Sequence, residues 1–303
     1  MTKLLVFLLS FLAFFYQALA IQPQQAAIII FSFDRPLQLY SLLESINIFV
    51  KNINQKFVVY RTSDKEYEKA YREVQSAFSH ITLIKQSDHP KQDFKPLLLK
   101  CFEACSTPYI LFAVDDNLVI DYVDIDECIT TLEKTNSYGF YLMLGTNVNE
   151  QSYQGKISLP PLEKVQNNIF RYQFKQAIGD WNYPHNFEMT IFRKSSIEPL
   201  LKNLSYTSPN TLEQNWCWKA DSNKFGLIFD TSKIINIPLN LVQQDWHNPS
   251  QQSYSTKNLL EKWNQGLSID ITKVYKLNNT CLHVDYVPTF TKRKNNYFNT
   301  KKD

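Results

Sequence analysis

The segment YILFAVDDN (109–117) places the tightest constraint on how this chain can fold. It begins with an apolar run rich in Ile, Leu, Phe and Val, which predicts a buried strand. Two carboxylates, Asp115 and Asp116, then follow side by side. Two like charges in contact destabilise a fold unless a positive group lies between or beside them. The sequence therefore predicts a positive group at the end of this strand.

Strands and helices alternate along the first part of the chain. The segments that predict strands are 26–33, 56–62, 81–86 and 109–115. The segments between them that predict helices are 35–53, 63–78 and 95–105. This alternation indicates a parallel sheet with helices on both faces. Further on, the pattern predicts helices at 124–135, 196–203 and 208–220, and strands at 138–145, 169–177, 187–195 and 232–242.

The overall composition excludes several classes of function. With 303 residues, the chain is long enough for one large α/β domain. A net charge of +3, from 32 basic and 29 acidic residues, gives no sign of a nucleic-acid partner. There are only 6 glycines, and neither G-x-x-x-x-G-K-[ST] nor G-x-G-x-x-G occurs. A bound nucleotide would therefore be held without a glycine-rich loop of either kind.

The first 20 residues read as a secretory signal peptide. Lys3 precedes an apolar stretch at 4–16, and the segment ends in Ala18-Leu19-Ala20. An uncleaved anchor is the alternative, although the stretch is short for a membrane span of about 20 residues. We expect a periplasmic, extracellular or secretory-pathway protein in the first case and a single-pass membrane protein in the second. The five cysteines are interpreted as mostly buried thiols, with one bridge possible.

Polar residues follow three of the predicted strands. They are Ser32 to Arg35, Arg61 to Asp64, and Asp115 to Asn117. In open parallel sheets, ligands bind beyond the carboxyl ends of the strands. Helix capping explains Asp64 better than ligand binding does, and it explains Asp34 equally well. It does not explain the adjacent acid pair, because a cap needs one acid. A Mg²⁺ or Mn²⁺ ion carrying a diphosphate would resolve the repulsion.

Two of these motifs resemble a known family. IIIFSFDRPLQLYSLLES (28–45) resembles the opening of GT-A glycosyltransferases, especially family-2-like ones, in which a T/S-x-N-R-P-like turn follows the first strand. YILFAVDDN resembles their acidic D-x-D metal motif, although Asn117 stands at its third position. The resemblance implies an α/β fold with a mostly parallel central sheet, helices on both faces and an irregular C-terminal half. It also implies one domain at 21–303, with a nucleotide-binding half at 26–120 and an acceptor half at 121–303.

The resemblance also implies roles for individual residues. The nucleotide of a UDP- or GDP-sugar donor would be bound by Asp34, Arg35, Asp64 and Asp115. A Mn²⁺ or Mg²⁺ ion would be bound by Asp115, Asp116 and a late histidine, for which His283 is preferred over His247. The acceptor would be a hydroxyl group of a glycan, a lipid or a protein.

The acceptor half offers a candidate base and a candidate sugar site. Glu213, in SPNTLEQNW, could remove the proton of the acceptor hydroxyl, or could instead pair with Asn210 in a capping box. The loop GDWNYPHNFE (179–188) contains Trp181 and Glu188, which we expect to bind sugar, since sugars present both C–H faces and hydroxyl groups. Trp216 and Trp218 are interpreted as core residues.

The sequence thus predicts metal-assisted transfer of a sugar from a nucleoside diphosphate to a hydroxyl acceptor. One rival is a secreted, non-catalytic module of the same fold that binds a glycan or a protein partner. The other is a metal-dependent phosphohydrolase, for which the histidines are few and scattered.

Cleavage of the leader can be tested directly. We expect the mature protein to begin at Ile21, because signal peptidase cuts after the A-x-A pattern. Mass spectrometry of the protein expressed in a secreting host gives the N-terminal residue. An intact Met1 in the membrane fraction would show that the segment is an anchor.

Overall fold

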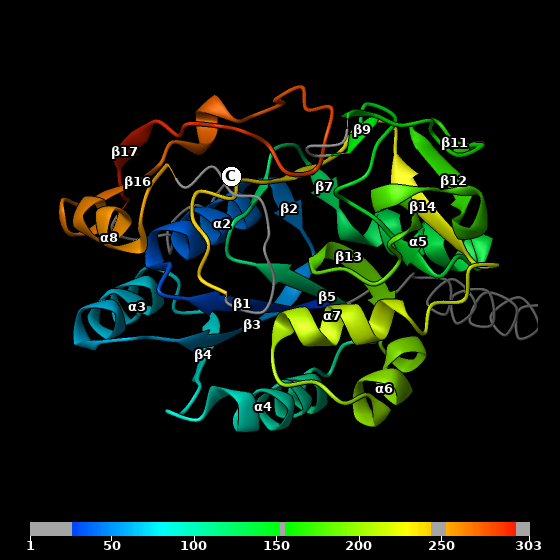
Figure 1. Ribbon diagram of the computed structural model, residues 1–303. Coiled ribbons are helices and arrows are strands. Elements are labelled where there is room, and N and C mark those ends of the chain that lie inside the picture. Colours follow the sequence, from blue (N-terminus) through cyan, green and yellow to red (C-terminus); the bar gives the residue numbers. More distant parts are fainter. Residues whose placement is uncertain (1–25, 152–154, 244–252, 295–303) are drawn as a thin grey trace, which may run out of the picture.

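The computed structural model describes residues 26–151, 155–243 and 253–294, so the predicted signal peptide and His247 lie outside it. Its centre is a nine-stranded sheet in the order β11-β12-β14-β8-β13-β5-β1-β3-β4 (Figure 1). The strands are β1 (Ala26–Phe33), β3 (Ile53–Arg61), β4 (Ile81–Lys85), β5 (Tyr109–Val114), β8 (Gly139–Phe140), β11 (Glu163–Gln166), β12 (Ile169–Gln173), β13 (Glu188–Arg193) and β14 (Phe225–Phe229).

The two halves of the sheet pair differently. In the first half, β1 lies parallel to both β3 and β5, and β3 lies parallel to β4. In the second half, β13 runs antiparallel to β5 and β8, and β12 runs antiparallel to β14 and β11, while β14 is parallel to β8. Because β13 is antiparallel to β5, the beginning of β13 lies at the sheet edge where β5 ends.

Helices cover both faces of the sheet (Figure 1). Residues of α2 (Pro36–Phe49), α3 (Lys65–Ala77), α5 (Ile125–Thr135) and α8 (Thr256–Asn264) pack into one hydrophobic core. Residues of α4 (Pro90–Ala104), α6 (Lys194–Asn203) and α7 (Pro209–Cys217) pack into a second core on the opposite face. The expected α/β fold class, a central sheet between two helical layers, is confirmed.

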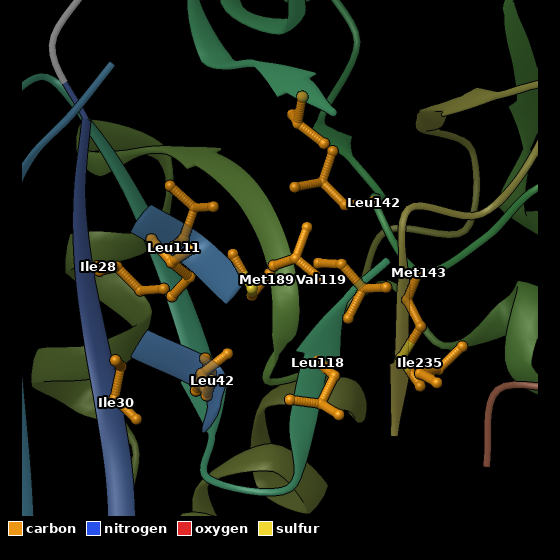
Figure 2. Packing of buried hydrophobic residues seen from close by; sticks show 14 of the residues in the cluster. Ile28, Ile30, Leu42, Leu111, Leu118, Val119, Leu142, Met143, Met189 and Ile235 are labelled. Atoms are coloured by element: carbon orange, nitrogen blue, oxygen red, sulfur yellow. The ribbon is translucent and has the colours of Figure 1, made fainter. Parts of the chain in front are cut away.

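Strand β1 is apolar from Ala26 to Phe31 because both of its faces are covered. Ile28 and Ile30 belong to the first core, whereas Ala27, Ile29 and Phe31 belong to the second. Successive side chains point to opposite faces of a sheet, so a strand covered on both sides needs no polar position. Figure 2 shows part of the first core, where Ile28, Ile30 and Leu111 of the sheet lie near Leu42 of α2.

The remaining strands and 3-10 helices are short. They are β2 (Val50–Lys51), β6 (Asn117–Val119), β7 (Val123–Asp124), β9 (Glu150–Gln151), β10 (Gly155–Lys156), β15 (Ile234–Asn236), β16 (Leu267–Ile269), β17 (Phe290–Lys292), η1 (Phe174–Gln176), η2 (Gly179–Asn182) and η3 (Ile271–Lys273). Strand β15 is antiparallel to β6, with Asn236 opposite Asn117. This pairing brings a segment from late in the chain beside the acid motif.

Several boundaries differ from the expectation. Helix α4 begins at Pro90 instead of residue 95, because Pro90 is accommodated in the first turn, where its missing N–H costs nothing. The predicted strand at 138–145 shortens to the two residues of β8, and helix α8 and strand β14 were not predicted. None of the five cysteines, all of which lie in the described ranges, forms a disulfide. Within the described residues, no helix has the length and hydrophobicity needed to cross a membrane.

Candidate functional site

A cavity of about 1090 Å³ opens at the carboxyl ends of the parallel strands. Both halves of the chain line it: Phe33 and Arg61 at the ends of β1 and β3, Asp116 after β5, Glu188 at the start of β13 and Glu213 on α7. This is the edge at which open parallel sheets bind ligands.

Arg35 is the positive group that the acid pair requires. Its Nη1 lies 2.8 Å from Asp115 Oδ1 and 3.0 Å from Asp116 Oδ2. Arg35 and Asp115 are only 7% and 3% exposed. The guanidinium is also fixed by Asn240, to whose Oδ1 Arg35 Nε donates at 2.8 Å and to whose backbone oxygen Nη2 donates at 2.5 Å. A buried side chain therefore balances the charge of Asp115.

Asp115 is consequently enclosed within the protein. Its Oδ2 accepts hydrogen bonds from Ser32 Oγ at 2.7 Å and from the Phe33 backbone N–H at 3.3 Å. Burial raises the pKa of Asp115 to about 6 against the opposing effect of Arg35. Both carboxylate oxygens accept hydrogen bonds from the protein, and Asp115 also lines the cavity, so its role as a ligand of metal or nucleotide stays a prediction. Asp115 fixes the position of Arg35 and the turn after β1.

Asp116 has a different environment. Its side chain is 12% exposed, lines the cavity and accepts a 2.9 Å hydrogen bond from Asn236 Nδ2. The backbone of Asn236 forms a bridge with His283, and both residues line the cavity. Asn236 Oδ1 is buried and has no hydrogen-bond partner among the described residues. An unpartnered oxygen beside a carboxylate and an imidazole fits a hard divalent cation.

Such a cation would still need ligands from a substrate. Within 26–151, 155–243 and 253–294, no three His, Cys, Asp or Glu side chains converge into a metal site. Mg²⁺ and Mn²⁺ commonly take one or two carboxylates and complete their coordination with phosphate oxygens and water. Asp116, Asn236 and His283 therefore suit an ion that arrives with a diphosphate.

Glu213 lies on α7, is partly buried and lines the cavity. Its Oε1 accepts a 3.2 Å hydrogen bond from the Phe187 backbone N–H, and burial raises its pKa to about 7. The alternative interpretation, a capping box with Asn210, is wrong. Ser208 and Thr211 form that box, each side chain accepting a hydrogen bond from the backbone N–H of the other.

Glu188 stands between the acid pair and Glu213. It accepts a hydrogen bond from Asn117 Nδ2, while Asn117 Oδ1 accepts one from the Val114 backbone N–H at 3.1 Å. Burial, together with the nearby carboxylates of Asp116 and Glu213, raises the pKa of Glu188 well above its usual value. The asparagine at the third motif position is therefore buried and holds this glutamate at the cavity.

The two other acids predicted to bind nucleotide face the protein backbone. Asp64 caps α3 by accepting hydrogen bonds from the N–H groups of Glu66 and Tyr67. Asp34 adopts a left-handed conformation, with φ of 52°, and accepts a 2.8 Å hydrogen bond from the Ser63 N–H. Neither residue lines the cavity. The capping interpretation of Asp64 is confirmed, and the structure does not bring either acid to the predicted site.

The aromatic residues are also distributed differently from the prediction. Trp181 is fully buried, and its Nε1 donates to the Val148 backbone oxygen at 3.0 Å, so its predicted contact with sugar is wrong. Tyr183, two residues later, is 38% exposed and lines the cavity. Trp216 is in the core as expected, whereas Trp218 is 73% exposed. The composition of this loop does not indicate that Trp181 is buried and Tyr183 exposed.

The ion pair at Arg35 leads to a stability prediction. Asp115→Ala should lower the free energy of unfolding by about 3 kcal/mol, because it leaves a buried guanidinium short of one partner. Asp64→Ala is the matched control and should cost about 1 kcal/mol, the value of a helix cap. Urea denaturation measures both. Equal losses in the two variants would contradict the structural role assigned to Asp115.

A search against family models finds no match. In sequence, the chain is similar to the bifunctional glycosyltransferase pgtA of Dictyostelium discoideum, with 26% identity over 196 residues. The alignment covers 58% of this chain and 25% of that protein, so the chain spans about a quarter of its relative's length.

Two solved structures of low sequence identity are also similar. S. aureus TarS 1–349 in complex with UDP has a TM-score of 0.45 and 11% identity, over 70% of this chain and 60% of that one. GalNAc-T7 with UDP, GalNAc and Mn²⁺ has a TM-score of 0.49 and 8% identity, over 71% and 44%. The chain is thus similar in sequence to a glycosyltransferase, and it has the α/β architecture, with helices on both faces of a central sheet, that its motifs predict.

Proposed function

We propose that this chain transfers a sugar from a nucleoside diphosphate donor to a hydroxyl acceptor. The observation that carries the proposal is a single cavity in which Glu213, with a pKa of about 7, shares the walls with Asp116 and with basic side chains. The sequence similarity to a glycosyltransferase supports it. If the predicted leader directs secretion, this transfer takes place in the secretory pathway or outside the cytoplasm.

The donor would occupy the part of the cavity beside β3 and α4. Arg61 stacks over the Phe33 ring, with its guanidinium carbon 3.6 Å from the ring centre, and Lys91 lines the same cavity. A guanidinium and an ammonium group offset the charge of phosphate oxygens through charge-assisted hydrogen bonds. This supports a diphosphate between these residues and Asp116.

A divalent cation would be held by Asp116, with Asn236 and His283 beside it. When bound, it would offset the negative charge that develops on the departing diphosphate. Arg35 keeps the acid pair in place whether or not an ion is present, since it is anchored by Asn240.

Glu213 is the proposed base. Its carboxylate would take the proton of the acceptor hydroxyl while the new C–O bond forms and the bond to the diphosphate breaks. A pKa near 7 suits this role, because the ionised form is then present at neutral pH and is still basic enough to accept a proton. Glu188, whose pKa is raised well above its usual value by burial and by the carboxylates of Asp116 and Glu213, would form a hydrogen bond with a sugar hydroxyl.

Donor binding is tested by calorimetry with UDP and GDP, each with and without Mn²⁺. We expect one nucleotide to bind at least about tenfold more tightly with Mn²⁺, and Mn²⁺ alone to bind weakly, because phosphate oxygens supply most of its ligands. Asp116→Asn should remove the effect of Mn²⁺ but keep metal-free binding. If neither nucleotide binds under any condition, the donor site is refuted; binding without any turnover would favour a non-catalytic module.

The base is tested with Glu213→Gln. Release of UDP or GDP from the donor sugar should fall by about 10²- to 10⁴-fold, while the Kd of the nucleotide stays within about twofold. In the wild type, the rate should rise tenfold per pH unit below pH 7 and level off above it, because only the ionised carboxylate accepts a proton. A fully active variant would exclude this role.

Stability provides the control for that variant. The folded pKa of Glu213, about 7, lies above its ordinary value of 4.5, so burial of its charge lowers stability as the pH rises from 4.5 to 7. Glutamine removes this penalty. At pH 8 the melting temperature of Glu213→Gln should therefore equal or exceed that of the wild type, and a lower value would indicate a structural role.

A further inference from the structure

The charged side chains of the cavity are divided between its two parts. Arg61 and Lys91, together with Asp88, belong to the part beside β3 and α4, which therefore carries more positive than negative side chains. The other part, between η2, β13 and α7, is lined by Asp180, Glu188 and Glu213. The charges that act on Glu188 are all carboxylates, those of Asp116, Glu213 and Asp180. We call the second part, lined by Asp180, Tyr183, Glu188 and Glu213, the acidic end.

Tyr183 gives the acidic end an aromatic wall. Its ring is 38% exposed, whereas Trp181 and Trp216 nearby in sequence and space are fully buried. The backbone on both sides is anchored: the Pro184 oxygen accepts a 2.8 Å hydrogen bond from Tyr141 Oη, and Trp181 Nε1 donates to the Val148 oxygen. The ring therefore projects from a fixed segment of chain.

Asp180 adds an unused acceptor. Its Oδ2 is buried and has no hydrogen-bond partner in the part of the chain that the structure describes. A buried polar atom without a partner is costly, and it is satisfied when a ligand supplies a donor. Burial also raises the pKa of Asp180, which makes a neutral donor such as a hydroxyl a suitable partner.

We propose that the acidic end binds an uncharged carbohydrate acceptor, with the Tyr183 ring against the C–H face of the sugar and Asp180 and Glu188 on its hydroxyl groups. This inference rests on the proposed function, since it names the acceptor of the same reaction. An aromatic face combined with several hydrogen-bonding carboxyl groups matches a sugar, which is apolar on one face and polar at its edges. Phosphorylated acceptors would be repelled by the carboxylate of Asp116 and by the ionised form of Glu213, which is present at and above pH 7.

The test uses methyl glycosides of glucose, galactose, mannose and N-acetylglucosamine, and the 6-phosphate of each. Their binding to residues 21–303 is measured by saturation-transfer NMR, in the presence of the nucleotide that calorimetry identifies. We expect at least one neutral glycoside to bind about tenfold or more tightly than its 6-phosphate. Equal or tighter binding of the phosphate, or no glycoside bound at all, would overturn the inference.

Variants locate the binding surface. Tyr183→Ala should weaken glycoside binding about tenfold and leave the nucleotide Kd unchanged, while Tyr183→Phe, which keeps the ring, should bind like the wild type. Trp218→Ala is the matched control, because this exposed aromatic residue does not line the cavity. Unchanged glycoside binding by Tyr183→Ala would place the sugar elsewhere.

The two proposals fail in different ways. Nucleotide binding without glycoside binding would leave the donor site standing and refute the carbohydrate acceptor. Glycoside binding without any nucleotide would refute sugar transfer and leave a carbohydrate-binding site at the acidic end. Circular dichroism of each variant confirms that a loss of binding is not a loss of fold.

Discussion

The ion pair between Arg35 and Asp115 is the interaction on which the rest of the site depends. It joins the turn after β1 to the end of β5, 80 residues later in the sequence, and Arg35 also contacts Asn240, which lies 205 residues after it. Breaking a buried pair costs far more than an exposed one, because the remaining charge cannot be solvated. Three distant segments are therefore held at one edge of the sheet, and Asp116 is presented to the cavity without repelling its neighbour.

The three residues of the acid motif point in different directions and make different contacts. Asp115 faces the interior and binds Arg35, Asp116 faces the cavity, and Asn117 turns inward to hold Glu188. An aspartate in place of Asn117 would bring another carboxylate against Glu188, whereas the amide donates a hydrogen bond to it. The asparagine that departs from the family pattern is thus explained by its contact with β13.

Local patterns predicted much of the fold but less of the site. The strands at 26–33 and 109–115 and the capping role of Asp64 follow from runs and spacings of a few residues, and the structure bears them out. No local sequence pattern predicts the contact of Asn240 with Arg35, because the two residues are 205 positions apart and meet only in the folded chain. Trp181 and Tyr183 share one polar loop, and only tertiary packing decides that the first is buried and the second exposed.

Three carboxyl groups close together at one edge of a sheet lower the stability of the folded chain. This loss of stability supports a functional role for them. Burial raises the pKa values of Asp180, Glu188 and Glu213, so the folded chain holds protons there that the unfolded chain would release. If these three residues were only structural, Asn or Gln side chains could replace them, because an amide does not ionise and its burial carries no cost of this kind. Burial and the neighbouring carboxylates raise the pKa of Glu188 well above its usual value, and burial raises that of Glu213 to about 7. Under the proposed function, this environment keeps Glu213 basic enough to accept the proton of a hydroxyl group near neutral pH.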